Sequence, residues 1–153
     1  MAPDIDETPL PRELPRVHAL RIAEAKARAV AALTEGAFVL AADTVVGCGR
    51  RILPKAETRE QAVRCLDLLS GRRHRVYSGV CVVAPGGRSA SRVVTTMVRF
   101  KRLSAEEAEG YLDSGEWRGK AGGYAIQGMA GGPIPAINGS HSNVLGLPLT
   151  ETL

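Results

Sequence analysis

The chain has 153 residues, of which 44% are hydrophobic and 24% charged, proportions that are ordinary for one globular domain. Its formal net charge of +4 suits an anionic ligand without choosing between a nucleotide and a nucleic acid. The sequence shows no secretory signal, no apolar stretch of membrane-spanning length and no CxxC pair among its three cysteines. We therefore expect a cytoplasmic protein with reduced thiols and no membrane partner.

The first predicted element is a helix from about Arg16 to Thr34, after an irregular stretch that is rich in proline. Lys26 falls in the middle of the apolar face of this helix. A charge is poorly placed there unless it points into a pocket, and the alternative is a side chain that extends its ammonium to water. The helical pattern favours the pocket.

The segment from Ala37 to Ala42 is a short, continuous apolar run, which predicts a strand buried on both faces. Asp43 and Thr44 follow it directly. Ligands of open α/β sheets bind beyond the carboxyl ends of the strands, so Asp43 is a candidate to bind a metal ion or to accept a proton from an attacking water. From position alone, a turn aspartate that caps backbone N–H groups is an equal alternative.

Two further helices and a hairpin are expected in the rest of the chain. Thr58 and Ser104 each begin a sequence with capping-box spacing, and each predicted helix ends at a Ser-Gly pair. Between these helices, β-rich runs at 75–84 and 92–100 are separated by a Pro-Gly-Gly turn. Helices interspersed with strands predict a mixed α/β sheet.

Other polar groups give weaker signals. Lys55 and Lys120 could offset phosphate charge, although solvated surface lysines are the commoner outcome. The basic cluster 72–75 could contact phosphates or nucleic acid, but the chain lacks the interleaved aromatic residues of a single-strand binder. The histidines show no metal-ligand spacing, which argues against a zinc site.

Short motifs occur in a characteristic order along nearly the whole chain. They are Asp6-Glu7-Thr8, Lys26-Ala27, Ala41 to Val46, Ile52 to Lys55, Leu69 to Arg72 with His74 and Val76, Gly115-Glu116, Lys120 to Gly122, Tyr124 with Ile126 to Gly128, and Ser142 to Val144 with Gly146 to Pro148. In this order they resemble the Maf family of nucleoside triphosphate pyrophosphatases. The resemblance implies an α/β fold with a mixed, strongly bent sheet flanked by helices and two lobes around a cleft, as in inosine triphosphatase-like proteins. It also implies metal-assisted hydrolysis of a nucleoside triphosphate to the monophosphate and pyrophosphate.

The same resemblance implies roles for individual residues. Asp43 would be the general base that activates water, while Thr44 and Gln127 would help to select the nucleobase. The sequence 42–44 is similar to the branch of the family that prefers dTTP and UTP. Lys26 and Lys55 would lie near the phosphates. Glu7 would lie near a divalent cation, Mg²⁺ or Mn²⁺.

The sequence also departs from the family pattern. Family members usually open with a strand and a Ser-Pro-Arg-Arg loop that grips the triphosphate, and they continue into a final helix. The resemblance therefore implies a single domain over 1–153 that is truncated at both ends, and residues 133–138 also look unusual. We expect such a fragment, or an inactive truncated paralogue, to hydrolyse dTTP or UTP poorly.

A non-catalytic regulator that binds nucleotide or nucleic acid, connected with cell division, is the alternative from a different class. The joint presence of Asp43, Thr44 and Gln127 favours the enzyme, because a pure binding module needs no base. A nucleoside triphosphate is the expected partner and nucleic acid is disfavoured. The sequence leaves open the physiological nucleotide, the identity of the metal and whether the protein forms a homodimer.

Overall fold

A computed structural model describes residues 4–124 and 136–138 of the chain. Five strands form one sheet in the order β2-β1-β3-β4-β5, and every pairing among them is antiparallel. The elements in chain order are α1 (Pro15–Ala31), β1 (Val39–Cys48), β2 (Arg51–Leu53), α2 (Arg59–Leu69), β3 (Arg73–Val83), β4 (Ser89–Arg99), α3 (Ala105–Ser114) and β5 (Ala136–Asn138).

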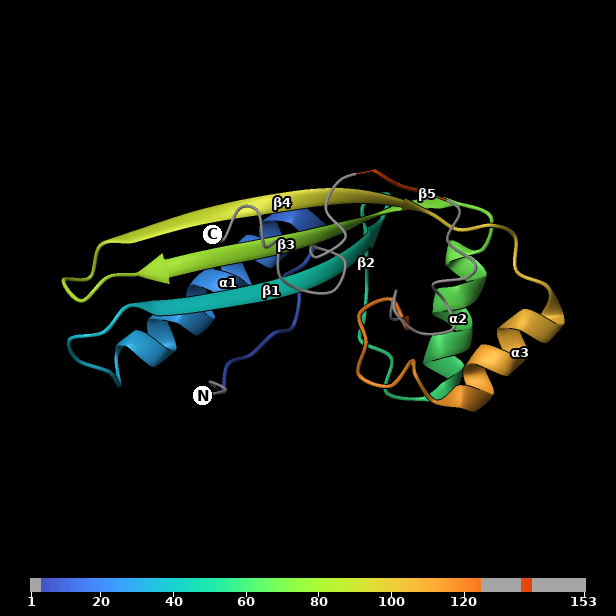
Figure 1. Ribbon diagram of the computed structural model, residues 1–153, viewed down its shortest axis with the longest axis horizontal. Coiled ribbons are helices and arrows are strands. Elements are labelled where there is room, and N and C mark those ends of the chain that lie inside the picture. The colour runs from blue at the N-terminus through green and yellow to red at the C-terminus, as the bar shows by residue number, and fades with distance from the viewer. Residues whose placement is uncertain (1–3, 125–135, 139–153) are drawn as a thin grey trace.

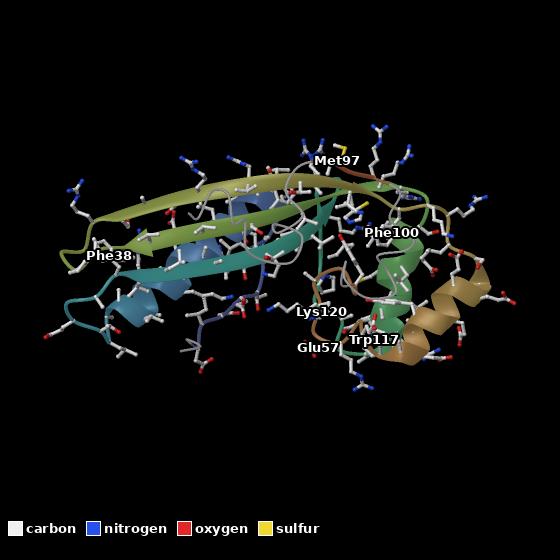
Figure 2. The ribbon with its side chains drawn as sticks, viewed as in Figure 1. Phe38, Glu57, Met97, Phe100, Trp117 and Lys120 are labelled. Carbon is white, nitrogen blue, oxygen red and sulfur yellow. The ribbon has the colours of Figure 1, made fainter. Side chains whose placement is uncertain are left out.

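The sheet is long and bent, and the helices cover it in two groups. Figure 1 shows α1 beneath β1, β3 and β4, while α2 and α3 lie together at the other end of the sheet. A small apolar cluster joins α1 to β1 and β3, and a larger one joins α2, α3 and the neighbouring ends of the strands. Phe100 and Trp117 belong to the larger cluster, whereas Phe38 lies at the far end of the sheet (Figure 2). The predicted α/β class with a bent sheet and flanking helices is confirmed.

The prediction for the first strand was wrong in length and in burial. β1 continues to Cys48 because it pairs along almost its whole length with β3, from Val39 opposite Val83 to Gly47 opposite Arg75. Asp43 therefore lies in the middle of a strand and not beyond its carboxyl end. Only one face of this part of the strand is covered, since Leu40 is 50% exposed while Val39 is buried. An apolar run without alternation does not distinguish the two cases.

The predicted first helix is confirmed, but it ends at Ala31 instead of Thr34. Beyond that point the apolar pattern has nothing to pack against, and Leu33 is 75% exposed. Two glycines bring the helix close to the sheet. A Cβ at Gly79 of β3 would lie 2.3 Å from the carbonyl oxygen of Ala19, and one at Gly47 of β1 would lie 2.8 Å from Pro15. The backbones of helix and sheet are thus in direct contact.

The predicted capping boxes and hairpin are confirmed. The side chains of Thr58 and Ser104 each accept a hydrogen bond from the third residue of the helix that follows, and each capping box is complete. β3 and β4 pair over eleven residues each, from Arg73 opposite Arg99 to Val83 opposite Ser89. Within the described part of the chain, no helix has the length and apolar character required to cross a membrane. The three cysteines are free thiols.

Candidate functional site

A cavity of about 230 Å³ opens where α1, β1 and β2 meet the segment that precedes α1. Four of the predicted site residues line this cavity, namely Glu7, Asp43, Thr44 and Lys55. Its other lining residues are Pro9, His18, Val45, Ile52, Leu53, Pro54 and Ala121. Residues from five separate parts of the sequence therefore contribute to one small space.

Lys26 joins these residues through two ion pairs. Its Nζ lies 3.0 Å from Asp43 Oδ1 and 3.0 Å from Glu7 Oε1. Lys55 approaches the same Glu7 oxygen at 3.9 Å. The charge on the apolar face of α1 is thus neutralised by a carboxylate on the sheet and by another on the preceding segment. Two cations and two acids meet at this point.

Burial and ion pairing act on these acids in opposite directions. Burial raises the pKa of Asp43, whose side chain is only 7% exposed, and the hydrogen bond from Lys26 opposes that rise without cancelling it. Glu7 is 42% exposed, and although burial tends to raise its pKa, the contacts with Lys26 and Lys55 leave the pKa below its usual value. Burial tends to lower the pKa of Lys26, but its bonds to Asp43 and Glu7 raise it. The pKa of Asp43 is therefore shifted upward and that of Glu7 downward.

The segment that carries Glu7 is tied to α1 by a second polar network. Glu13 accepts hydrogen bonds from Arg21 Nε at 2.6 Å and from the backbone N–H of Leu10 at 3.1 Å, and its other contact is with His18 Nδ1 at 2.8 Å. The bond from Arg21 lowers the pKa of Glu13 to about 2. Arg21 also donates to the carbonyl oxygen of Thr8 at 3.2 Å. This network holds the chain beside α1 and so places Glu7 within reach of Lys26.

Lys55 is positioned by a short backbone ladder. Residues Lys55 and Ala121 form an antiparallel bridge. On either side of it, the backbone N–H of Ala56 donates to the carbonyl oxygen of Lys120 at 3.1 Å, and that of Gly122 donates to the carbonyl oxygen of Pro54 at 3.1 Å. Through Ala121, the glycine-rich segment 119–123 thus forms one wall of the cavity. Lys120 itself is exposed and does not line the cavity.

Thr44 borders the cavity, but its hydroxyl points the other way. Successive residues of a strand face opposite sides of a sheet, so Thr44 lies on the face away from α1. Its Oγ1 is 3.3 Å from Oγ of Ser78 on β3. Gln127, the other residue predicted to select the nucleobase, lies outside the described residues.

Two residues at this site were not predicted from the sequence. His18 lines the cavity and Ser78 contacts Thr44. The helical spacing of His18 and Lys26, eight residues apart, is compatible with one face of α1, but the pattern offered no reason to select a histidine without metal-ligand spacing. Ser78 lacked any local signal, because its contact depends on the register between β1 and β3.

The chain is similar to known proteins over most of its length. A family model described as Maf-like protein matches residues 1–153. A dTTP/UTP pyrophosphatase from Caulobacter vibrioides is 63% identical over 150 residues, which cover 98% of this chain and 78% of that protein. Another from Paramagnetospirillum magneticum is 64% identical over 148 residues, covering 97% and 78%, and one from Mesorhizobium japonicum is 60% identical over 156 residues, covering 98% and 75%. With a matching family model along its whole length and relatives of this similarity, the chain belongs to the Maf-like protein family.

Proposed function

We propose that this protein is a nucleoside triphosphate pyrophosphatase that converts dTTP and UTP to their monophosphates and pyrophosphate. The observation that carries the proposal is the buried carboxylate of Asp43, held 3.0 Å from Lys26 in a cavity that Lys55 also lines. Relatives at about 60% identity carry the name dTTP/UTP pyrophosphatase, which supports the choice of substrate.

In this proposal Asp43 acts as the general base. It accepts a proton from a water molecule, whose oxygen forms a bond to the α-phosphorus as the bond to the bridging oxygen breaks and pyrophosphate leaves with the electron pair. Burial raises the pKa of Asp43 and makes it a stronger base than an ordinary aspartate. The ammonium of Lys26 favours the ionised form that this role requires.

The lysines bind the phosphates. Lys26 is shared between two carboxylates, of which Glu7 is the more exposed, at 42% against 7% for Asp43. A phosphate oxygen therefore replaces Glu7 at the ammonium more readily than it replaces Asp43. Lys55, with half of its side chain exposed, is available to a second phosphate. Both cations offset the negative charge that otherwise repels an attacking water.

Glu7 would hold a divalent cation, Mg²⁺ or Mn²⁺. Carboxylate oxygens are the hard donors that Mg²⁺ prefers, and Mg²⁺ is commonly held by one or two carboxylates together with the phosphates of its substrate. Because the described residues include no group of three or more acidic, histidine or cysteine ligands, this arrangement depends on the nucleotide's own oxygens. When bound, the cation would withdraw charge from the phosphate oxygens.

Thr44 and Gln127 are assigned to the nucleobase. Thymine and uracil each present carbonyl oxygens and a ring N–H, and a hydroxyl and an amide can pair with both kinds of group. The hydroxyl of Thr44 contacts Ser78 on the face of β1 opposite to Asp43, so this assignment requires the nucleobase to reach that face of the sheet.

The test is pyrophosphate release from dTTP, UTP, dATP and dGTP in the presence of Mg²⁺ or Mn²⁺. In Asp43→Asn the side chain keeps its size but cannot accept the proton, so kcat should fall by about 10²- to 10⁴-fold. The affinity for a non-hydrolysable dTTP analogue should change far less. Asp113→Asn is the matched control, because Asp113, on α3, is an exposed carboxylate that pairs with Arg59 of α2 and does not line the cavity.

Each contrary result has a definite meaning. An Asp43→Asn variant that still releases pyrophosphate at the original rate would show that another group is the base. A wild-type protein that binds the analogue but releases no pyrophosphate would support the non-catalytic regulator instead. Faster turnover of dATP or dGTP than of dTTP would overturn the choice of substrate.

A further inference from the structure

His74 and Tyr124 form a buried hydrogen bond that links β3 to the loop beside the cavity. The His74 Nε2 and Tyr124 Oη atoms are 2.7 Å apart, and the two residues are 2% and 5% exposed. Phe100 packs edge-on against both rings, with centroids 5.2 Å from His74 and 5.0 Å from Tyr124. The two residues are fifty positions apart in the chain, and His74 packs against Phe100 and Tyr124, which both belong to the larger apolar cluster.

A purely apolar core would not need this pair. The third ring of the group is a phenylalanine, and phenylalanine at the other two positions would preserve the ring contacts. The Nδ1 atom of His74 is buried and has no hydrogen-bond partner among the residues that the structure describes, so within them the imidazole is held by Tyr124 alone. A buried polar bond specifies one relative arrangement where apolar contacts tolerate several. The pair therefore sets the position of Tyr124 in particular.

Tyr124 in turn directly follows the glycines of the segment that borders the cavity. Gly122 and Gly123, immediately before it, have φ angles of +68° and +73°, and a Cβ at Gly122 would lie 2.9 Å from Val46. Gly122 also donates to the carbonyl oxygen of Pro54, and Ala121 bridges to Lys55. A shift of Tyr124 is thus transmitted through two tightly packed residues to the backbone of Lys55. Ala121 and Lys55 both line the cavity that contains Asp43.

We propose that His74 is a positioning residue, which acts through Tyr124 to hold Ala121 and Lys55 where the phosphates of the nucleotide bind opposite Asp43. This inference rests on the proposed function, because it takes the cavity to be the nucleotide site. His74 does not touch the substrate in this proposal. Its contribution is to the affinity for the triphosphate, and its loss should raise KM more than it lowers kcat.

The first test compares Tyr124→Phe with the double variant His74→Phe/Tyr124→Phe. Tyr124→Phe removes one hydroxyl and leaves the imidazole without its partner, whereas the double variant replaces the whole pair with apolar rings and leaves no unpaired group. Both should show a KM for dTTP raised about tenfold, with kcat changed by less than about threefold. A displacement of 1 Å at a site can cost about 10²-fold, and we expect Lys55 to move by less than that. The double variant should keep the wild-type Tm within a few degrees.

Tyr111→Phe is the matched control, since Tyr111 is a tyrosine of the same apolar cluster, 4% exposed, on α3 and away from the cavity lining. It should lower Tm without moving KM. His74→Gln, whose amide can still form a hydrogen bond with Tyr124, should keep part of the affinity that His74→Leu loses. A merely structural role for His74 would move Tm in these variants and leave the ratio of KM to kcat unchanged.

The outcomes separate the two proposals. If the wild-type chain releases pyrophosphate and the double variant has the same KM and kcat, the positioning role is wrong and the proposed function survives. If the wild-type chain releases none, the dissociation constant of a non-hydrolysable dTTP analogue replaces KM in the comparison, and an unchanged constant in the double variant again overturns the positioning role. Absence of both release and binding in the wild type would overturn both proposals.

Discussion

Lys26 lies on the apolar face of α1, where an isolated charge would be costly. Its ammonium is instead bonded to Asp43 and Glu7, at 3.0 Å in each case. The same contacts lower the pKa of Glu7 and limit the rise that burial causes in the pKa of Asp43. One lysine thus sets the protonation of both carboxylates of the candidate site.

Replacing Lys26 by glutamine should therefore change the pH dependence of the reaction. Without the ammonium, burial raises the pKa of Asp43 further, and a general base must be ionised to act. The acidic limb of the kcat/KM profile should move to higher pH, and kcat/KM at pH 7 should fall about 10- to 100-fold through the lost phosphate contact. The measurement is kcat/KM for dTTP across pH 5 to 9.

Lys101→Gln provides the comparison for that profile, because Lys101 is paired with Glu107 on the surface, outside the cavity. Surface ion pairs contribute about 0–1 kcal/mol, so its profile should coincide with that of the wild type. An acidic limb that stays in place in Lys26→Gln would show that Asp43 is not the group whose ionisation limits the reaction.

At the scale of elements, the contact between α1 and the sheet determines whether Lys26 reaches Asp43 at all. The helix lies so close to β3 that Gly79 has room for a hydrogen atom only, with the carbonyl oxygen of Ala19 2.3 Å from where a Cβ would be. Lys26 is two turns further along the same helix. Moving the helix away from the sheet would lengthen its contact with Asp43 on β1.

Gly79→Ala should consequently lower both stability and activity. The new methyl group must push α1 away from β3, and overpacking of this kind costs about 1–3 kcal/mol in free energy of unfolding. Gly86→Ala, in the turn between β3 and β4 with no atom within 4 Å of its Cβ position, should be close to neutral. Urea denaturation and pyrophosphate release of the two variants provide the check, and equal stabilities would show that the helix is not held as closely as described.

At the scale of the whole molecule, the two apolar clusters are connected by the same long strands. β3 contributes Cys81 and Val83 to the smaller cluster and Val76 to the larger one. His74, the second residue of this strand, packs against Phe100 and Tyr124 of the larger cluster, and burial lowers its pKa from 6.5 to about 4. A histidine that must stay neutral in the folded state makes the stability of the domain depend on pH.

The sign of that dependence follows from proton binding. Between pH 6.5 and 4 the unfolded chain protonates His74 and the folded chain does not, so the free energy of unfolding should decrease as the pH falls through this range. The contribution of His74 between pH 7 and 4.5 is about 2–3 kcal/mol. Urea denaturation of the wild type and of His74→Phe/Tyr124→Phe at both pH values isolates it, since the carboxylates are common to the two proteins. Parallel decreases in the two proteins would contradict the assignment to His74.

Local patterns in the sequence were sufficient for several parts of the structure. The capping residues Thr58 and Ser104 act within four residues of themselves, and the Pro-Gly-Gly turn joins strands that are neighbours in the chain. The expectation that Lys26 faces a pocket rested on helical spacing, which is also local. The length of β1 could not be predicted in this way, because it is determined by pairing with residues of β3 that lie 28 to 44 positions later in the chain.

By itself, the sequence determined the family, the α/β class, the starts of α2 and α3, and the placement of a charged residue on the apolar face of α1. Only the tertiary structure decided that Asp43 lies within a strand, that it meets Lys26 and Glu7, and that Thr44 turns to the opposite face toward Ser78. It also decided that His74 meets Tyr124. The reason is physical: propensities and caps depend on neighbours within a turn or two, whereas strand register, side-chain direction and buried ion pairs depend on which distant segments pack together.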